Sequence, residues 1–192
     1  RIHNSAWETT NMVYSLFCAR DILLSGKTII VVYADIIYEP NLLAAILTNN
    51  ADIATVIDLE WHALWTARFE NPLEDAETLR LSADGHLVEI GQVPSSLEEI
   101  EGQYIGLTKF SAAGALAFEA VYRDISKYVP GKTMHNCYFT DVLQGLVERG
   151  DVIDTVSVRG GWLEFDSPSD CALYEKVSGQ DSEHKFFDIG WR

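Results

Sequence analysis

Two apolar runs separated by one helical segment limit the possible folds of this chain more than any other feature. Residues 28–35, TIIVVYAD, and residues 52–58, DIATVID, are apolar at consecutive positions, a pattern typical of strands buried on both faces. Between them, Pro40 opens a helix-forming segment, PNLLAAILTN. Strand, helix and strand joined by short connections form a βαβ unit, so we expect a parallel sheet with helical cover.

The rest of the chain alternates between helix and strand, with one interruption. Apolar spacing predicts helices over residues 9–24, 61–69, 111–128 and 140–149 and from Ser167 onward, strands over 102–110 and 152–158, and an extended segment over 160–166. The interruption, TLRLSADGHLVEIG at 78–91, is typical of an antiparallel hairpin that turns at Asp84 and Gly85. We therefore expect a single α/β domain over residues 1–192, with a mostly parallel sheet covered by helices and an antiparallel hairpin insertion.

The charge balance limits the kinds of ligand. With 29 acidic against 14 basic residues the formal net charge is −15, and no cluster of Lys and Arg exists that would bind nucleic acid or an anionic membrane. A cationic small molecule, or a phosphate carried on a divalent metal, suits such a chain better. The three cysteines, Cys18, Cys137 and Cys171, form neither a zinc-type pair nor a disulfide framework, which favours the cytoplasm.

Three aspartates follow apolar segments that we expect to be extended: Asp35, Asp58 and Asp166. In open α/β sheets, ligands bind in the crevice beyond the carboxyl ends of the strands. Aspartate also favours strand-to-helix turns, where it caps the helix, and for each of the three this structural role is an alternative. Asp35 and Asp166 are each soon followed by Pro, so both would lie at the rim of the sheet just before a helix. Two carboxylates at one rim could hold Mg²⁺ while phosphates and waters fill its other positions.

Six stretches of the chain resemble, in the same order, the nucleotidyltransferase superfamily and within it the phosphocholine cytidylyltransferase-like branch. They are TTNMVYSLFCAR, IIVVYADIIYEP, DLEWHALWTARFENPLEDAETLRL, EGQYIGLTKFS, CYFTDVLQGLVERG and GGWLEFDSPSD, and together they run across nearly the whole chain. The resemblance implies a Rossmann-like fold of the nucleotide-diphospho-sugar transferase type. It also implies the joining of CMP from CTP to a small phosphorylated or phosphonate amino alcohol, with release of pyrophosphate.

The resemblance also implies roles for individual residues. Asp35 matches the aspartate that holds Mg²⁺ and the nucleotide phosphates, Asp166 matches the second metal ligand, and Glu164 matches a pocket residue beside it. Most relatives have Gly where Ala34 precedes Asp35, and we expect this small residue to do little harm. Asn11 matches a polar position in the active-site cleft. Mg²⁺ is thus the implied cofactor, with Asp35 and Asp166 as the implied catalytic residues.

An aromatic and acidic pocket for a zwitterionic acceptor can be assembled from further residues. Trp61 and Trp65 share one face of a short helix, and Arg68 follows on nearly the same face. The two rings could stack on an ammonium head while Arg68 meets the phosphate or phosphonate end of the same substrate. Further candidates for this pocket are Asp75, Glu77, Tyr104 and Trp162. Two structural alternatives stay open: the tryptophans can form a core stripe, and the acids can lie on a solvated hairpin face.

Members of the resembled family begin with a strand and a Gly-rich loop whose basic residues cradle the triphosphate, and nothing of that kind precedes residue 1. We therefore expect an N-terminally incomplete domain that lacks its first strand and is inactive by itself. The strand at 28–35 would then have a free edge that another chain could fill, which allows a homo-oligomer.

The leading hypothesis is a cytoplasmic, Mg²⁺-dependent cytidylyltransferase that uses CTP and phosphocholine or 2-aminoethylphosphonate. One alternative keeps the reaction but makes the acceptor a sugar 1-phosphate, whose pocket would need more neutral hydrogen-bonding groups and fewer tryptophans. A second alternative is a catalytically degenerate domain that binds a nucleotide or a partner chain. The missing Gly-rich loop favours this second alternative, whereas Asp35, Asp166 and Glu164 oppose it.

Overall fold

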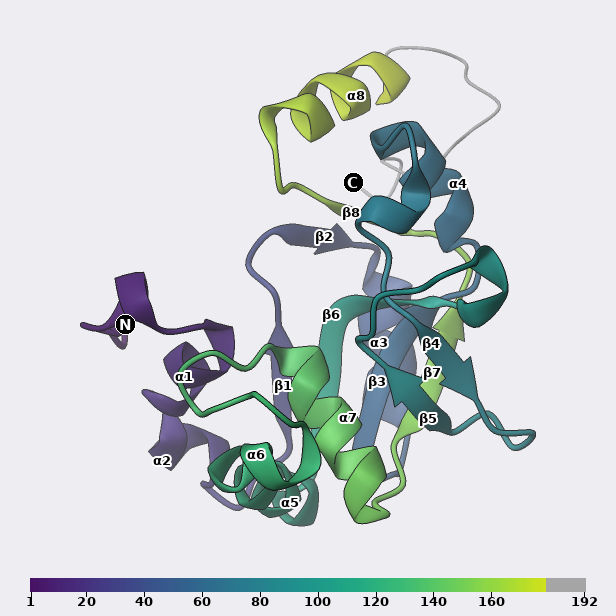
Figure 1. Cartoon of the computed structure of the whole chain (residues 1–192). Coiled ribbons are helices and arrows are strands. Elements are labelled where there is room, and N and C mark those ends of the chain that lie inside the picture. Colours follow the sequence, from purple (N-terminus) through teal and green to yellow (C-terminus); the bar gives the residue numbers. More distant parts are fainter. Residues whose placement is uncertain (179–192) are drawn as a thin grey trace.

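The computed structural model describes residues 1–178. A four-stranded sheet forms its centre, in the strand order β1–β6–β3–β7 (Figure 1). The strands are β1 (Ile29–Val32), β3 (Ile53–Asp58), β6 (Gln103–Phe110) and β7 (Asp154–Val158). β3 pairs parallel with β7, whereas β6 lies antiparallel between β1 and β3. Three of the four strands thus run in one direction, which confirms the prediction of a mostly parallel sheet.

The predicted strand–helix–strand unit is present. α3 (Pro40–Thr48) starts at Pro40 and connects β1 to β3. All residues of β3 are buried, as its continuous apolar run predicts. β1 differs, because it lies at the edge of the sheet that the described residues form, and Val32 is 40% exposed. The prediction of two buried faces is therefore correct for β3 and wrong for β1.

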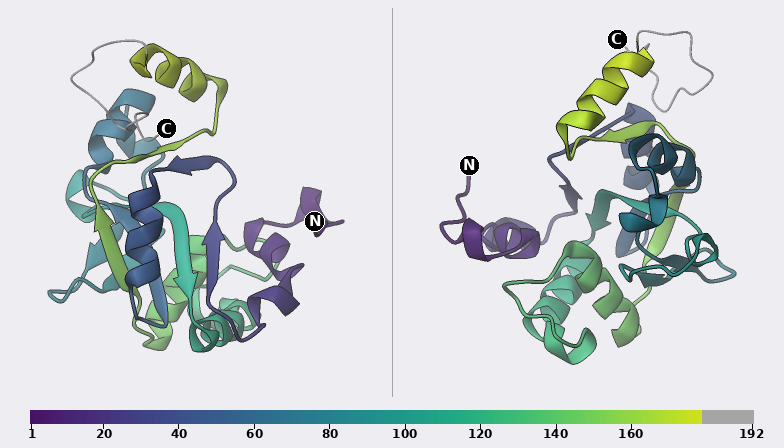
Figure 2. Two further views of the ribbon diagram at one scale, coloured as in Figure 1. Left: turned by 180° about the vertical axis from the view of Figure 1, so that it is seen from behind. Right: turned by 45° about the horizontal axis from the view of Figure 1, so that its top comes forward.

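Helices cover both faces of the central sheet. The covering helices are α3, α4 (Trp61–Arg68), α5 (Ala112–Arg123) and α7 (Phe139–Arg149). Because side chains alternate along a strand, Ile53 and Ile57 of β3 join the core with α5 and α7, whereas Ala54 and Val56 join the core with α3 and α4. Figure 2 shows α3 and α7 on opposite sides of the sheet. One strand thus supplies both apolar layers.

Two of the predicted helices are interrupted. Residues 9–24 were expected to form one helix, and the observed elements are η1 (Trp7–Thr9), α1 (Met12–Phe17) and α2 (Arg20–Leu23). Ala19 leaves the helical region (φ −98°, ψ 24°), and Phe17 stacks on Tyr122 of α5 with ring centroids 4.1 Å apart. Asp124 likewise separates α5 from α6 (Ile125–Tyr128). Tertiary packing thus ends helices that apolar spacing alone would continue.

Two small antiparallel sheets lie beside the central one. The first is the predicted hairpin, formed by β4 (Leu79–Leu81) and β5 (Leu87–Ile90). The second pairs β2 (Ile36–Tyr38) with β8 (Trp162–Glu164) and was not predicted. Asp35 is therefore followed by a strand, because the alternation of buried Ile36 and exposed Ile37 suits pairing with β8. The expectation that Asp35 stands directly before a helix is therefore wrong.

The remaining elements are η2 (Pro72–Glu74), η3 (Leu97–Glu99) and α8 (Pro168–Ser178), the last beginning where Ser167 and Pro168 predicted. α8 extends above β8 and beside α4 (Figure 1). Within residues 1–178, no helix has both the length and the apolar character that a membrane crossing requires.

Candidate active site

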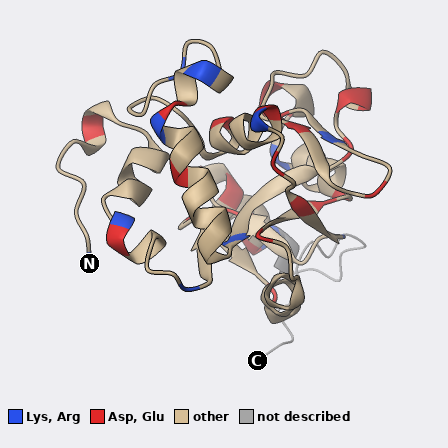
Figure 3. Cartoon of the chain, turned by 90° about the horizontal axis from the view of Figure 1, so that it is seen from below, with Lys and Arg blue, Asp and Glu red and all other residues tan. Residues whose placement is uncertain are grey.

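A cavity of about 180 Å³ gathers six of the residues that the sequence predicted for the site. Its lining consists of Met12, Tyr33, Trp65, Asp75, Glu77, Gln103, Tyr104, Tyr138, Thr140, Glu164 and Asp166. We call it the acidic cavity, because its lining has four carboxylates, four aromatic rings and, among the described residues, no Lys or Arg. Acids outnumber bases along the whole ribbon (Figure 3). The convergence of the acids with aromatic rings, rather than the excess of acids, marks this cavity as the candidate site.

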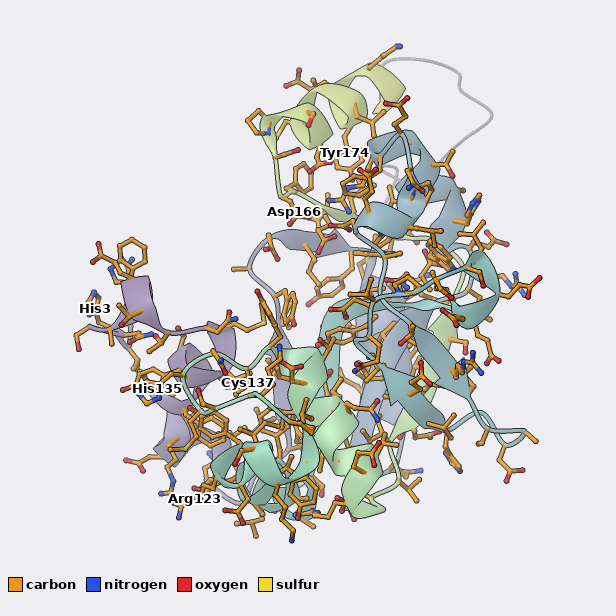
Figure 4. The ribbon with its side chains drawn as sticks, in the orientation of Figure 1. His3, Arg123, His135, Cys137, Asp166 and Tyr174 are labelled. Carbon is orange, nitrogen blue, oxygen red and sulfur yellow. The ribbon has the colours of Figure 1, made fainter. Side chains whose placement is uncertain are left out.

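A second cavity, of about 380 Å³, is lined by Phe17, Arg20, Glu119, Tyr122, Arg123 and Met134. Its one carboxylate, Glu119, already binds both arginines, at 2.5 Å to Arg20 Nε and at 2.9 Å to Arg123 Nη2. Figure 4 labels Arg123 and Asp166 in opposite parts of the molecule. None of the predicted site residues lines this second cavity, so its larger volume does not make it the candidate site.

The acidic cavity lies beyond the carboxyl end of β1, where ligands bind in open α/β sheets. Tyr33 directly follows β1, and Tyr104 lies near the start of the antiparallel β6. Gly106, two positions after Tyr104 in β6, has φ +80°. A Cβ on Gly106 would lie 2.6 Å from Cγ of Tyr33. Glycine is therefore needed here, because it lets the Tyr33 ring pack directly on the strand. The two tyrosine rings then meet edge to face, with centroids 5.6 Å apart.

Hydrogen bonds hold two of the acids against the wall of the cavity. Trp65 Nε1 donates to Asp75 Oδ2 at 3.0 Å. The main chain of Glu77 is fixed by Gln103, whose Nε2 donates to the Glu77 carbonyl oxygen at 2.5 Å and whose Oε1 accepts the Glu77 N–H at 3.2 Å. Thr140 Oγ1 donates to Glu77 Oε1 at 3.4 Å. Both carboxylates are thus placed at the wall by residues that also line the cavity.

Arg68 has partners other than the substrate phosphate that we expected it to meet. Its side chain is 1% exposed and lies behind the lining of the acidic cavity. Nη1 donates to Glu164 Oε2 at 2.8 Å, Nη2 to Asp166 Oδ2 at 2.6 Å, and Nε to Asp170 Oδ1 at 3.0 Å. Burial lowers the pKa of Arg68, but the hydrogen bonds to Asp170 and Asp166 and the charge of Glu164 outweigh it, so the pKa is raised and the group stays charged. The structure thus places Arg68 as an internal counter-ion for three acids.

Three acids of the cavity, Glu164, Glu77 and Asp75, have a raised pKa and ionise less readily than ordinary carboxyl groups. Burial and the neighbouring charge of Asp166 raise the pKa of Glu164 to about 7, although its ion pair with Arg68 acts in the opposite direction. Burial also raises the pKa of Glu77 and of Asp75 above their usual values. Mutual repulsion and poor solvation favour the neutral forms, and a bound cation would relieve both. The cavity is therefore electrostatically suited to a positively charged group.

Asp35 lies next to this cavity, in the turn just before β2, but is not one of its lining residues. Its carbonyl oxygen accepts the N–H of Phe165 at 2.8 Å, which brings the main chain of Asp35 beside the residue before Asp166. The Asp35 side chain is exposed, and no hydrogen bond or ion pair to its carboxylate is found among the described residues. Within residues 1–176, no three His, Cys, Asp or Glu side chains converge to hold a metal ion. That Asp35 and Asp166 share an Mg²⁺ ion whose remaining ligands come from phosphates and water therefore stays a prediction.

The lining of the cavity does not include three further predicted site residues, nor the strand-end acid Asp58. Trp61 is buried and meets Trp65 edge to face, and Trp162 is buried with Nε1 donating to Asp58 Oδ2 at 3.0 Å. Asp58 also accepts the N–H groups of Glu60 and Gly160. The structural alternative therefore describes these three residues in this structure, because Trp61 packs in the core and Trp162 is hydrogen-bonded there to Asp58. Asn11 caps α1 through the N–H of Met12, and its Nδ2 donates to the carbonyl oxygen of Asn136.

Sequence reasoning missed five lining residues: Met12, Tyr33, Gln103, Tyr138 and Thr140. Tyr33 stands two positions before Asp35, where a strand-end position could have suggested it, but the other four have no local signature. It also missed Asp170, which contacts Arg68. The spacing of Ser167 and Asp170 is that of a capping box at the start of a helix, and this signal could have identified Asp170 as a fixed acid.

No protein-family model matches the chain. A search among characterised proteins finds the CTP:phosphoglutamine cytidylyltransferase of Campylobacter jejuni at 39% identity, over 87% of this chain and 68% of that protein. Among solved structures, the inositol-1-phosphate CTP transferase from T. maritima matches with a TM-score of 0.58 at 16% identity, over 91% of this chain. This chain spans 64% of the length of that structure.

A second solved structure, of a Bacillus anthracis protein described as a glucose-1-phosphate thymidylyltransferase in complex with a sucrose, matches with a TM-score of 0.60 at 12% identity. The match covers 97% of this chain and 67% of that structure. At these identities the two solved structures confirm the fold alone, whereas the Campylobacter relative is similar enough in sequence to establish kinship. The chain therefore belongs to the nucleotidyltransferase superfamily, and within it to the cytidylyltransferase family that includes the Campylobacter enzyme.

Proposed function

We propose that this protein transfers CMP from CTP to a phosphoryl oxygen of a small acceptor that also carries an ammonium group. The name of the Campylobacter relative supports CTP as the donor and a phosphorylated glutamine as the nearest acceptor class. Phosphocholine and 2-aminoethylphosphonate share the same two features, a phosphoryl or phosphonyl oxygen and a cationic nitrogen. A sugar 1-phosphate lacks the second.

The acidic cavity is the observation that carries this proposal. Four carboxylates and four aromatic rings, without a basic side chain in the lining, suit a cationic head group rather than a neutral sugar. Glu77 and Asp75 supply negative charge at one wall, and the rings of Trp65, Tyr104 and Tyr138 supply π faces. The ammonium group of the acceptor binds here in our proposal, which leaves its phosphoryl end directed out toward CTP.

The reaction requires little proton transfer from the protein. The acceptor oxygen is already an anion, so it attacks the α-phosphorus of CTP directly, the bond to the β-phosphate oxygen breaks, and pyrophosphate leaves with that electron pair. The work of the chain is to hold the acceptor in line and to exclude competing water. In our proposal Asp35 and Asp166 would hold Mg²⁺, which neutralises charge on the phosphates when it is bound.

A pyrophosphate-release assay on the full-length protein tests the proposal. CTP or UTP with Mg²⁺ is offered together with phosphoglutamine, phosphocholine, 2-aminoethylphosphonate or glucose 1-phosphate. We expect turnover with CTP and the ammonium-bearing acceptors. Equal or faster turnover with glucose 1-phosphate would favour a sugar acceptor, and no turnover with any pair would favour a degenerate binding domain.

A matched pair of variants assigns the acceptor site. Asp75→Asn removes one charge from the acidic cavity, and we expect the KM for ammonium-bearing acceptors to rise about tenfold, the effect of losing roughly one charge interaction. Glu98→Gln removes one charge from an exposed position on η3 and should leave the KM unchanged. Equal behaviour of the two variants would contradict the assignment of the acceptor to this cavity.

A further inference from the structure

The start of α8 is built around Asp170. Its Oδ2 accepts the main-chain N–H groups of Asp166 at 3.0 Å and of Ser167 at 2.9 Å, and the hydroxyl of Ser167 at 2.9 Å. Ser167 Oγ in turn accepts the N–H of Asp170 at 3.3 Å, which completes a capping box. The side chain of Asp170 is 5% exposed and does not line the acidic cavity. Asp170 therefore acts on the site only through the residues that it holds.

Arg68 fixes Asp170 from the other side. Its Nε binds Asp170 Oδ1 at 3.0 Å, while Nη1 and Nη2 bind Glu164 and Asp166. A guanidinium group is planar and rigid, so one side chain of α4 sets the relative positions of three carboxylates from β8, the following turn and α8. Both side chains of this link are buried, with 1% of Arg68 and 5% of Asp170 exposed.

Asp166 is consequently held twice, once through its side chain and once through its main chain. Arg68 takes its Oδ2, and Asp170 takes its N–H. Its side chain is still 44% exposed, and within the described part of the chain no hydrogen bond occupies its Oδ1. One carboxylate oxygen is thus held at the cavity and remains available.

We propose that Arg68 and Asp170 are positioning residues that fix Asp166 so that its free oxygen can bind a divalent cation without prior ordering of the turn at 165–170. That Asp166 binds the cation rests on the proposed function, whereas the control of Asp166 by Asp170 does not. Partners of this kind act on metal affinity through the ligands that they orient.

The test uses the full-length protein and its Asp170→Asn and Arg68→Lys variants. Asparagine keeps one acceptor for the main chain but places an amide instead of a carboxylate beside Arg68, and lysine keeps the charge but loses the planar fork. The control variants are Asp151→Asn and Arg149→Lys, because Arg149 and Asp151 form a two-bond ion pair at 2.6 and 2.9 Å at the end of α7 and neither lines the acidic cavity. Ser167→Ala is a milder change within the capping box, for use if the buried variants do not fold.

Three readouts separate positioning from simple stabilisation. The first is Mn²⁺ binding without nucleotide, measured by electron paramagnetic resonance. The second is hydrogen exchange of the amides of Asp166 and Ser167, and the third is whether kcat or KM changes. For Asp170→Asn and Arg68→Lys we expect Mn²⁺ affinity to fall about tenfold. Exchange of the two amides should accelerate by about the same factor in Asp170→Asn. kcat should fall while the acceptor KM changes less than about twofold, and Ser167→Ala should give the same signs at smaller size.

Several outcomes would overturn the proposal. If Asp170→Asn lowers Tm while Mn²⁺ affinity and amide exchange match the control variants, the network only stabilises the fold and the proposal is wrong. If the wild-type protein neither binds Mn²⁺ nor transfers CMP, the proposed function fails, and with it the cation role of Asp166. Faster amide exchange in Asp170→Asn would then still support the control of Asp166 by Asp170, so the two failures are distinguishable.

Discussion

Trp65 and Asp75 are joined by a hydrogen bond from the indole Nε1 to Oδ2 at 3.0 Å, and both side chains line the acidic cavity. An aromatic ring and a carboxylate are thereby fixed at one wall, and an ammonium group is attracted to both kinds of group. Trp65→Phe keeps an aromatic ring but loses the donor that holds Asp75. We expect the KM for ammonium-bearing acceptors to rise about fivefold to tenfold with kcat nearly unchanged, measured by steady-state kinetics. Trp7→Phe, at an exposed position on η1, is the control and should change neither.

Asp35→Asn separates chemistry from folding. The carboxylate of Asp35 is exposed and has no hydrogen bond or ion pair to the described residues, so its loss should move Tm by no more than about 1 °C. If it holds Mg²⁺ in the active protein, kcat should fall about a hundredfold or more. The same substitution at Asp84, in the hairpin turn, should affect neither quantity. Full turnover by Asp35→Asn would refute the metal role.

Asp58→Asn is expected to behave in the opposite way. Asp58 is buried and accepts from the N–H of Glu60 at 2.9 Å, the N–H of Gly160 at 3.0 Å and Trp162 Nε1 at 3.0 Å. An asparagine amide would turn a donor toward at least one of these donors. Urea unfolding should show a loss of about 2–3 kcal/mol, whereas kcat well below Tm stays within about twofold of wild type. A loss of activity without a loss of stability would give Asp58 a role in the site that this structure does not indicate.

Gly106→Ala tests how closely Tyr33 approaches β6. An added Cβ would stand 2.6 Å from the Tyr33 ring at a φ of +80°. Gly131 has a similar φ of +84°, but a Cβ there meets no described atom within 4 Å. Gly131→Ala should therefore cost only the backbone strain, about 1 kcal/mol, whereas Gly106→Ala should cost about 1–3 kcal/mol more because the ring must move. Equal unfolding free energies of the two variants would show that Tyr33 does not pack on the strand as described.

Glu77 should make stability depend on pH. Burial raises its pKa in the folded protein above its usual value of 4.5. The folded state therefore binds this proton more tightly than the unfolded state, so the contribution to stability is complete below pH 4.5 and is lost as the pH rises through the folded pKa. Glu77→Gln carries no such proton. The unfolding free energy of this variant, minus that of wild type, should therefore increase between pH 4 and pH 8.

Urea unfolding at these two pH values measures the difference, with Glu98→Gln on the exposed η3 turn as the control for removing one charge. A gain equal to that of the control would mean that Glu77 is solvated in the folded protein.

Local sequence patterns predicted the elements that depend on neighbouring residues. The continuous apolar run at Ile53–Asp58, the Asp84–Gly85 turn and the start of α3 at Pro40 are all set within a few positions of the chain, and all are found in the structure. The resemblance carried by motifs such as IIVVYAD and WLEFD led to the family that the Campylobacter relative confirms. These features can be recognised in the sequence because each depends on residues within a few positions of one another.

The packing of distant segments decided the rest. The placement of β8 and α8 against α4 decided the partners of two predicted site residues. Trp162 binds Asp58 instead of a ligand, and Arg68 binds three acids about 100 positions away instead of a phosphate. Tyr138 and Thr140 reach the acidic cavity only because α7 starts beside β6. The sequence alone determined the main strands and helices and which acids follow the extended segments, but not β2 or the breaks in two of the helices. The tertiary structure alone decided which side chains share the cavity, because burial, repulsion and hydrogen bonding between acids exist only after those elements have packed.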